Sequence, residues 1–181
     1  FDAEGVPSRD ALDARVAADI EALAALQNDD GGWSWWSRGL TSVPWQTLHV
    51  AHALVVARDA GYAAPADTLD RALAHLADIE SFIPPEYGDD VRITIEAYAI
   101  HVRAMAGDRD VPKATQIYRT AGIALQLDAV AWLWPAIDDP EIRTEIERLF
   151  ANRAVETAGA ATFATAYSED AYVIAPSDRR T

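Results

Sequence analysis

The chain has 181 residues, half of them hydrophobic, which is enough for one folded domain with a core. Its 15 Lys and Arg residues against 29 Asp and Glu residues give a formal net charge of −14, which disfavours nucleic acid and anionic membrane surfaces as partners because both are negative. Cysteine is absent, which excludes disulfides and thiol nucleophiles, and no apolar run reaches the roughly 20 residues that span a bilayer, so we expect no membrane insertion by this segment.

Two helices are predicted at the start of the chain. The first covers residues 9–27 with Ser8 as N-cap, and it should be half-exposed because its apolar residues share one face, namely Leu12, Val16, Ile20 and Leu23. The second covers residues 44–60 and ends at Gly61. It has almost no polar side, so it should be buried nearly all round.

Two more helices are predicted on either side of the Pro84-Pro85 loop. The earlier one, residues 65–79, is amphipathic. The later one covers residues 91–106, with Asp89 or Asp90 as its cap. Its first residues alternate with period two, as in a strand, but the apolar pattern continues at helical length, so we predict a helix.

The remaining helices are predicted at 112–120, 123–134 and 140–152. Pro135 ends the second of these, and Asp139-Pro140 begins the last one, because Asp is a good N-cap and proline suits the first helical position. Residues 162–174 break the helical pattern, and they predict a short β-hairpin or an ordered loop.

Half-exposed and buried helices thus alternate along the chain, and the fold class is predicted to be all-α. The repeat unit is a helical hairpin of roughly 40 residues, a period typical of helical arrays. Stacked hairpins with one buried and one exposed helix form either an open solenoid or a closed double ring of inner and outer helices.

The turn after the first helix is the most distinctive stretch of the sequence. Gly31 and Gly32 supply the backbone freedom that a sharp helix exit needs, and residues 28–30, Asn-Asp-Asp, suit a polar turn. Gln27 can reach backbone groups in this turn, and Trp33 can fold back to cover the end of the helix.

This spacing of Gln, Gly and Trp resembles the QW-type signature of α/α-toroid proteins, such as terpenoid cyclases and the thioester domains of α2-macroglobulin relatives. The predicted fold signature consists of Gln27, Asp30, Gly31, Gly32, Trp33 and Trp45. Further stretches at 57–62, 97–107 and 175–181 make nearly the whole chain similar to the thioester-domain region of bacterial α2-macroglobulin-like proteins. The resemblance favours the ring, an α/α toroid (a terpenoid cyclase/prenyltransferase-like superhelix) of which this chain holds a part.

The resemblance implies that residues 1–181 are a fragment of one thioester-type α/α-toroid domain, truncated at both ends. It implies a non-catalytic role in a protease-trapping endopeptidase inhibitor, located in the periplasm or outside the cell, with any membrane anchor elsewhere in the parent chain. The implied partners are neighbouring macroglobulin-like domains of the same chain and target proteases. The Cys-x-Glu-Gln thioester that some members carry would precede Phe1, so no residue here is assigned to it.

The remaining candidate residues do not predict a catalytic centre. His49 and His52 lie three apart on one helix without an obvious third ligand, so we predict hydrogen-bonded polar groups there. Paired acids fall in turns or at helix starts, where Asp is expected to cap, at Asp29-Asp30, Asp89-Asp90 and Asp138-Asp139. We assign no catalytic residue, no cofactor and no metal site. Trp35 and Trp36 need not both be buried, and they are the candidate contact surface.

Two other functions stay open from the sequence. One is an α/α-toroid enzyme, a cyclase or a polysaccharide-active enzyme; a cyclase would need an acid cluster on inner helices that are acid-poor here, and a zinc prenyltransferase would need a Cys ligand. The other is an α-solenoid scaffold for protein interaction, which would form an open superhelix rather than a ring.

Overall fold

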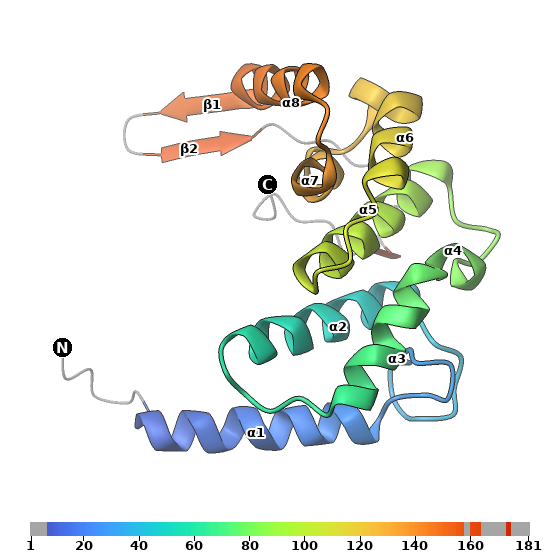
Figure 1. The fold of residues 1–181 in the computed structure, drawn as a ribbon, viewed down its shortest axis with the longest axis vertical. Helices are drawn as coiled ribbons and strands as arrows, with labels where there is room; N and C mark the ends of the chain where they lie inside the picture. Colours follow the sequence, from blue (N-terminus) through green and yellow to red (C-terminus); the bar gives the residue numbers. More distant parts are fainter. Residues whose placement is uncertain (1–6, 158–159, 164–172, 175–181) are drawn as a thin grey trace. The chain divides into compact units, whose positions relative to one another are not determined.

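A computed structural model of the protein describes residues 7–157, 160–163 and 173–174 (Figure 1). This part of the chain is mostly helical with one small two-stranded sheet, which confirms the all-α class. The chain divides into two compact units, Phe1–His75 and Leu76–Thr181. No helix within the described ranges is both long and apolar enough to cross a membrane. The double ring would involve both units, and it stays a prediction.

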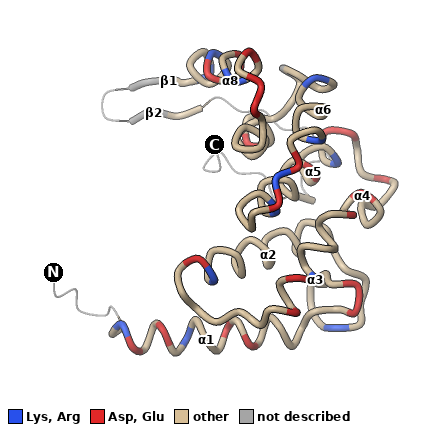
Figure 2. The backbone as a smooth tube through the Cα atoms, in the orientation of Figure 1, with Lys and Arg blue, Asp and Glu red and all other residues tan. Residues whose placement is uncertain are grey.

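The first unit contains α1 (Arg9–Ala25), α2 (Pro44–Asp59) and α3 (Ala66–Ala77), of which the last two residues belong to the second unit. Ser8 caps α1 as predicted, since its hydroxyl accepts a hydrogen bond from the backbone N–H of Ala11 at 3.3 Å. Helix α1 is more exposed than predicted, because Leu12 on its apolar face is 44% exposed. Figure 2 shows residues of both charges along it. Arg15 and Asp19 form an exposed ion pair on this helix at 2.9 Å.

Helix α2 supplies most of the core of the first unit. Five of its hydrophobic side chains are at most 4% exposed, namely Trp45, Leu48, Ala51, Leu54 and Val55. The prediction that α2 is buried nearly all round is wrong for one stripe, where His49, Ala53 and Val56 are exposed. These positions are four and three residues apart, so they share one face of the helix.

The predicted helix 65–79 is in fact two helices. Helix α3 ends at Ala77, Asp78 leaves the helical region with φ −111°, and α4 (Ile79–Phe82) follows as a single turn. Helix α5 (Asp89–Met105) is helical through residues 91–96, as predicted. Its N-cap is Gly88, so the prediction of Asp89 or Asp90 as the cap is wrong. Both carboxylates lie instead in the first turn, where they face the positive end of the helix dipole.

The region after α5 differs from the prediction in one helix. Helix α6 (Val111–Ala121) agrees with it, and the 3₁₀ turn η1 (Gly122–Ala124) follows. The predicted helix 123–134 shortens to α7 (Leu127–Leu133), because the backbone is extended at Leu125 and Gln126. The 3₁₀ turn η2 (Trp134–Ala136) contains Pro135, the residue predicted to end this helix.

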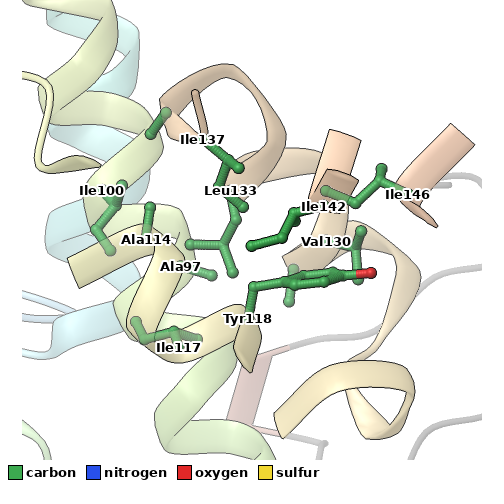
Figure 3. Close-up of a cluster of buried hydrophobic side chains, with 12 residues drawn as sticks. Ala97, Ile100, Ala114, Ile117, Tyr118, Val130, Leu133, Ile137, Ile142 and Ile146 are labelled. Carbon is green, nitrogen blue, oxygen red and sulfur yellow. The ribbon is translucent and has the colours of Figure 1, made fainter. Parts of the chain in front are cut away.

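The second unit has its own hydrophobic core, which is shown in Figure 3. Helix α5 packs against α7, and side chains from α6 and from the segment after α7 close the cluster. Tyr98 stacks on Trp132 with ring centroids 4.3 Å apart. The residues at its centre include Ala97, Ile100, Ala114, Ile117, Tyr118, Val130, Leu133, Ile137, Ile142 and Ile146.

Helix α8 (Pro140–Arg153) leads directly into the hairpin of β1 (Ala154–Thr157) and β2 (Ala160–Phe163). The two strands are antiparallel, with Ala154 opposite Phe163 and Thr157 opposite Ala160. A short β-hairpin or an ordered loop was predicted near 162–174. The described hairpin shares Thr162 and Phe163 with that range, and residues 164–172 lie outside the described ranges. Helix α8 ends at Arg153, within one residue of the prediction, and the backbone becomes extended at Ala154.

The N-cap of α8 predicts a pH-dependent contribution to stability. The backbone N–H of Ile142 is the largest cause of a lowered pKa for Asp139, and the N–H of Glu141 and the Arg119 guanidinium act in the same direction. A lowered carboxyl pKa contributes stability above the unfolded-state pKa, which is lost as the pH falls through the folded-state value. Asp139→Asn should keep the cap and flatten this acid dependence, whereas Asp139→Ala should lose both. Urea midpoints measured between neutral and strongly acidic pH test this, and an unchanged acid slope in Asp139→Asn would contradict it.

Candidate functional site

The signature turn is a close-packed structure that requires both of its glycines. Backbone hydrogen bonds close it, since Asn28 N–H donates to Gly32 O at 2.9 Å and Gly31 N–H donates to Asn28 O at 3.1 Å. Gly31 has φ +85°, and a Cβ there would overlap the carbonyl oxygen of Arg71 in α3. Gly32 has no such φ, but its Cβ would lie 2.7 Å from Ser42 Cβ and 2.8 Å from His75 Cε1. The turn therefore lies directly against α3.

Gln27 joins this turn to α3 from inside the unit. Its side chain is 1% exposed, and its Nε2 donates to Gly31 O and to Thr68 O, both at 2.9 Å. The prediction that Gln27 reaches backbone groups of the turn is thus confirmed. The second bond, to a residue 41 positions away, could not be read from the local sequence.

Replacing Gln27 by leucine should therefore weaken the first unit. The substitution keeps a similar volume but leaves the buried carbonyl oxygens of Gly31 and Thr68 without the donor that they have now, at a cost of about 1–3 kcal/mol. The matched control is Gln46→Leu, because the half-buried Gln46 makes no side-chain hydrogen bond within the described ranges. Urea unfolding of the two variants gives the difference, and equal stabilities would show that the Gln27 bonds contribute nothing.

Trp33 covers the end of α1, as predicted. It is 2% exposed, its indole Nε1–H donates to Leu23 O at 2.8 Å, and its backbone N–H donates to the Thr47 hydroxyl at 2.9 Å. Trp45, the last signature residue, is also buried, and its ring meets His49 edge-on with centroids 4.8 Å apart. These two tryptophans are core residues that hold α1 and α2 to the turn.

Asp30 organises the far side of the turn together with a histidine that the sequence reading passed over. One carboxylate oxygen of Asp30 accepts hydrogen bonds from Gly32 N–H at 2.9 Å and from the Ser42 hydroxyl at 2.8 Å. His75 is 3% exposed, and its Nδ1 lies 2.9 Å from the backbone oxygen of Asp30, so Nδ1 carries the proton. The spacing in the sequence could have predicted that His75 is buried, because it lies three residues after Ala72 and seven after Thr68, which puts all three on one face of α3.

Asn28 is a second organising residue that sequence reasoning had treated only as a turn former. Its Nδ2 donates to Leu40 O at 2.8 Å and to the Ser42 hydroxyl at 2.9 Å, and its Oδ1 accepts from Gly39 N–H at 2.7 Å. These bonds fix the whole loop between α1 and α2. Most polar atoms of the signature are thus used in bonds within the unit, so the signature is a structural device.

The two predicted contact residues differ sharply from Trp33. Trp35 is 54% exposed and Trp36 is 86% exposed. They border a small hollow of about 100 Å³ that Leu26, itself 43% exposed, also lines. Within the described ranges, no aromatic ring or cation stacks on either indole. We call Leu26, Trp35 and Trp36 the indole ledge.

The remaining candidate residues are the two histidines of α2 and the paired acids. His49 is exposed and His52 is half-buried, and burial lowers the pKa of His52. The described residues contain no group of three or more His, Asp or Glu side chains that could hold a metal ion. Three of the paired acids form ion pairs with arginines, namely Asp29 with Arg38 at 2.7 Å, Asp138 with Arg109 at 2.7 Å and Asp139 with Arg119 at 2.9 Å.

Comparison with known proteins identifies the fold. No family model and no curated protein matches the sequence. Among solved structures, the native α2-macroglobulin of Escherichia coli, from domain MG7 to the C-terminus, matches 81% of this chain and 24% of its own with TM-score 0.71 and 22% identity. A mutant of Salmonella α2-macroglobulin matches 96% of this chain and 11% of its own with TM-score 0.78 and 18% identity. Salmonella α2-macroglobulin reacted with methylamine matches 82% of this chain with TM-score 0.68 and 20% identity.

The chain thus spans about a quarter or less of the length of these proteins. The identities are low, so the likeness establishes a shared fold and leaves activity aside. The chain has the fold of the bacterial α2-macroglobulin region that it matches.

Proposed function

We propose that this chain is a non-catalytic part of a bacterial α2-macroglobulin-like endopeptidase inhibitor that entraps proteases. The observation that carries the proposal is the fold shared with α2-macroglobulins over most of the chain. Two of these solved structures are of Escherichia coli α2-macroglobulin activated by trypsin and by porcine elastase, so the matched proteins are ones on which proteases act.

The signature turn supports a structural role rather than a catalytic one. Gln27 Nε2, both side-chain polar atoms of Asn28 and one carboxylate oxygen of Asp30 form hydrogen bonds that hold α1, α3 and the intervening loop together. In this proposal residues 1–181 are part of one thioester-type toroid domain, whose parent lies in the periplasm or outside the cell.

The partners in this proposal are neighbouring macroglobulin-like domains of the parent and the target proteases. The indole ledge supports a docking role, because an exposed pair of tryptophans next to an exposed leucine is a larger apolar patch than scattered surface residues provide. An enzyme reading has less support, since neither a metal-type cluster nor an unengaged acid group occurs in the described signature site.

The test uses the intact parent protein with trypsin. Entrapment should protect large protein substrates from the bound trypsin while a small chromogenic peptide is still hydrolysed, because only the small substrate reaches an enclosed protease. Equal inhibition of both substrates would indicate ordinary active-site blocking, and inhibition of neither would overturn the proposal.

A second measurement decides whether the parent forms covalent links. Treatment with methylamine followed by mass spectrometry and thiol titration should show one amine adduct and one released thiol if a thioester is present. No change would place the parent among members that trap without covalent coupling.

A further inference from the structure

The indole ledge lies at the carboxyl end of α1. Helix α1 has no basic residue in its last turn, and Leu23 of that turn and the C-cap residue Leu26 line the hollow beside Trp35 and Trp36. The carboxyl end of a helix carries partial negative charge, which a cation would stabilise. Exposed indole faces also attract cations, most strongly the planar guanidinium group.

The basic residues of the first unit are already engaged. Within residues 7–75, Arg71 donates a hydrogen bond to Asn28 O. The other four arginines form ion pairs with nearby aspartates, namely Arg9–Asp13, Arg15–Asp19, Arg38–Asp29 and Arg58–Asp59. Four exposed carboxylates in the same described range have no ion-pair partner, namely Asp10, Glu21, Asp67 and Asp70. The described part of the first unit therefore has unpaired carboxylates and two exposed indoles, and each of its arginines already has a partner.

The hollow has room for the end of one side chain, since it measures about 100 Å³ and opens to solvent beside Trp35 and Trp36. Ser37 and Gln46 also line it, and neither uses its side chain in a hydrogen bond within the described residues. Their oxygens are acceptors that could receive guanidinium N–H groups.

We infer that the indole ledge binds an arginine side chain from a partner polypeptide, with the guanidinium stacked on Trp36 and Trp35. The inference rests on the contact role in the proposed function and adds the chemistry of the partner. Arginine fits better than lysine, because a planar, weakly hydrated group stacks on an indole more favourably than a compact ammonium.

The test is an NMR titration of the full 181-residue chain, which follows the indole N–H signals of Trp35 and Trp36. The probes are the blocked peptide Gly-Arg-Arg-Gly, its lysine counterpart and its citrulline counterpart, which has nearly the same shape without the charge. We expect the arginine peptide to shift both indole signals and to bind at least about fivefold more tightly than the citrulline peptide. Added salt should weaken the binding.

Two variants make the titration specific. Trp36→Leu keeps apolar surface but removes the indole, so it should lose most of the arginine effect, and its circular dichroism should match the parent because the site is 86% exposed. Leu40→Ala, at another exposed apolar residue outside the hollow, should bind normally.

Other outcomes would overturn the inference. Equal binding of the arginine and citrulline peptides would make the ledge merely apolar. Shifts caused by N-acetylglucosamine but not by the arginine peptide would make it a carbohydrate site. Neither result affects protease entrapment by the parent, so failure here is distinguishable from failure of the proposed function.

Discussion

Replacing Gly31 by alanine should destabilise the first unit by roughly 3 kcal/mol. Two costs add at this position. The left-handed backbone, with φ +85°, disfavours any residue with a Cβ, and the new Cβ would collide with the carbonyl oxygen of Arg71. That oxygen belongs to the backbone of α3, so it cannot rotate away, and the turn or the helix must shift.

Gly61 is the matched control for this prediction. It also has a left-handed backbone, with φ +92°, but nothing lies within 4 Å of the position that its Cβ would occupy. Gly61→Ala should therefore lose only the conformational part, about 1 kcal/mol. Urea unfolding followed by amide hydrogen exchange of first-unit residues separates the two variants. Equal losses of unfolding free energy in the two variants would mean that the turn and α3 move apart at little cost to make room for the new Cβ.

Replacing Trp33 by alanine should cost about 3–5 kcal/mol. The change removes a large side chain that is 2% exposed, and it leaves the carbonyl oxygen of Leu23 without the indole N–H that now lies 2.8 Å away. Because Trp33 closes the end of α1, amide exchange should accelerate most in the last turns of that helix.

Trp36→Ala is the control for Trp33→Ala, since it removes the same side chain from the same loop. At 86% exposure Trp36 has little contact to lose, so its unfolding free energy should change by no more than about 0.5 kcal/mol. A stability loss comparable to that of Trp33→Ala would show that Trp36 packs against the unit, and it would contradict the description of the indole ledge.

Much of the signature turn could be predicted from local sequence because its main requirements are local. Gly31, Gly32 and the polar residues before them mark a sharp turn, and Gln27 and Trp33 lie within reach of it. The partners on α3 could not be predicted in this way. Thr68, Arg71 and His75 are more than forty residues from their contacts in the turn, and only the packing of α3 brings them there.

The errors in the helix boundaries have physical causes of the same kind. The predicted helix 65–79 runs through Asp78 because the apolar pattern continues from Leu76 before it to Ile79 after it. The backbone nevertheless leaves the helical region at Asp78. Helix α7 starts later than its apolar run because the backbone is extended at Leu125 and Gln126. The hairpin begins at Ala154 because the helix gives way there to strand pairing, which depends on a partner strand rather than on local composition.

The sequence by itself determined the helical class, most helix positions, the turn with its two glycines, and the resemblance to α2-macroglobulin relatives. These follow from short-range patterns, in which the residues that cause a feature are also its neighbours along the chain. Only the tertiary structure decided which polar groups are buried together and which tryptophans are covered. Trp33 and Trp36 are three positions apart with the same side chain, yet one closes the core and the other faces solvent, because burial depends on what the rest of the fold places beside each residue.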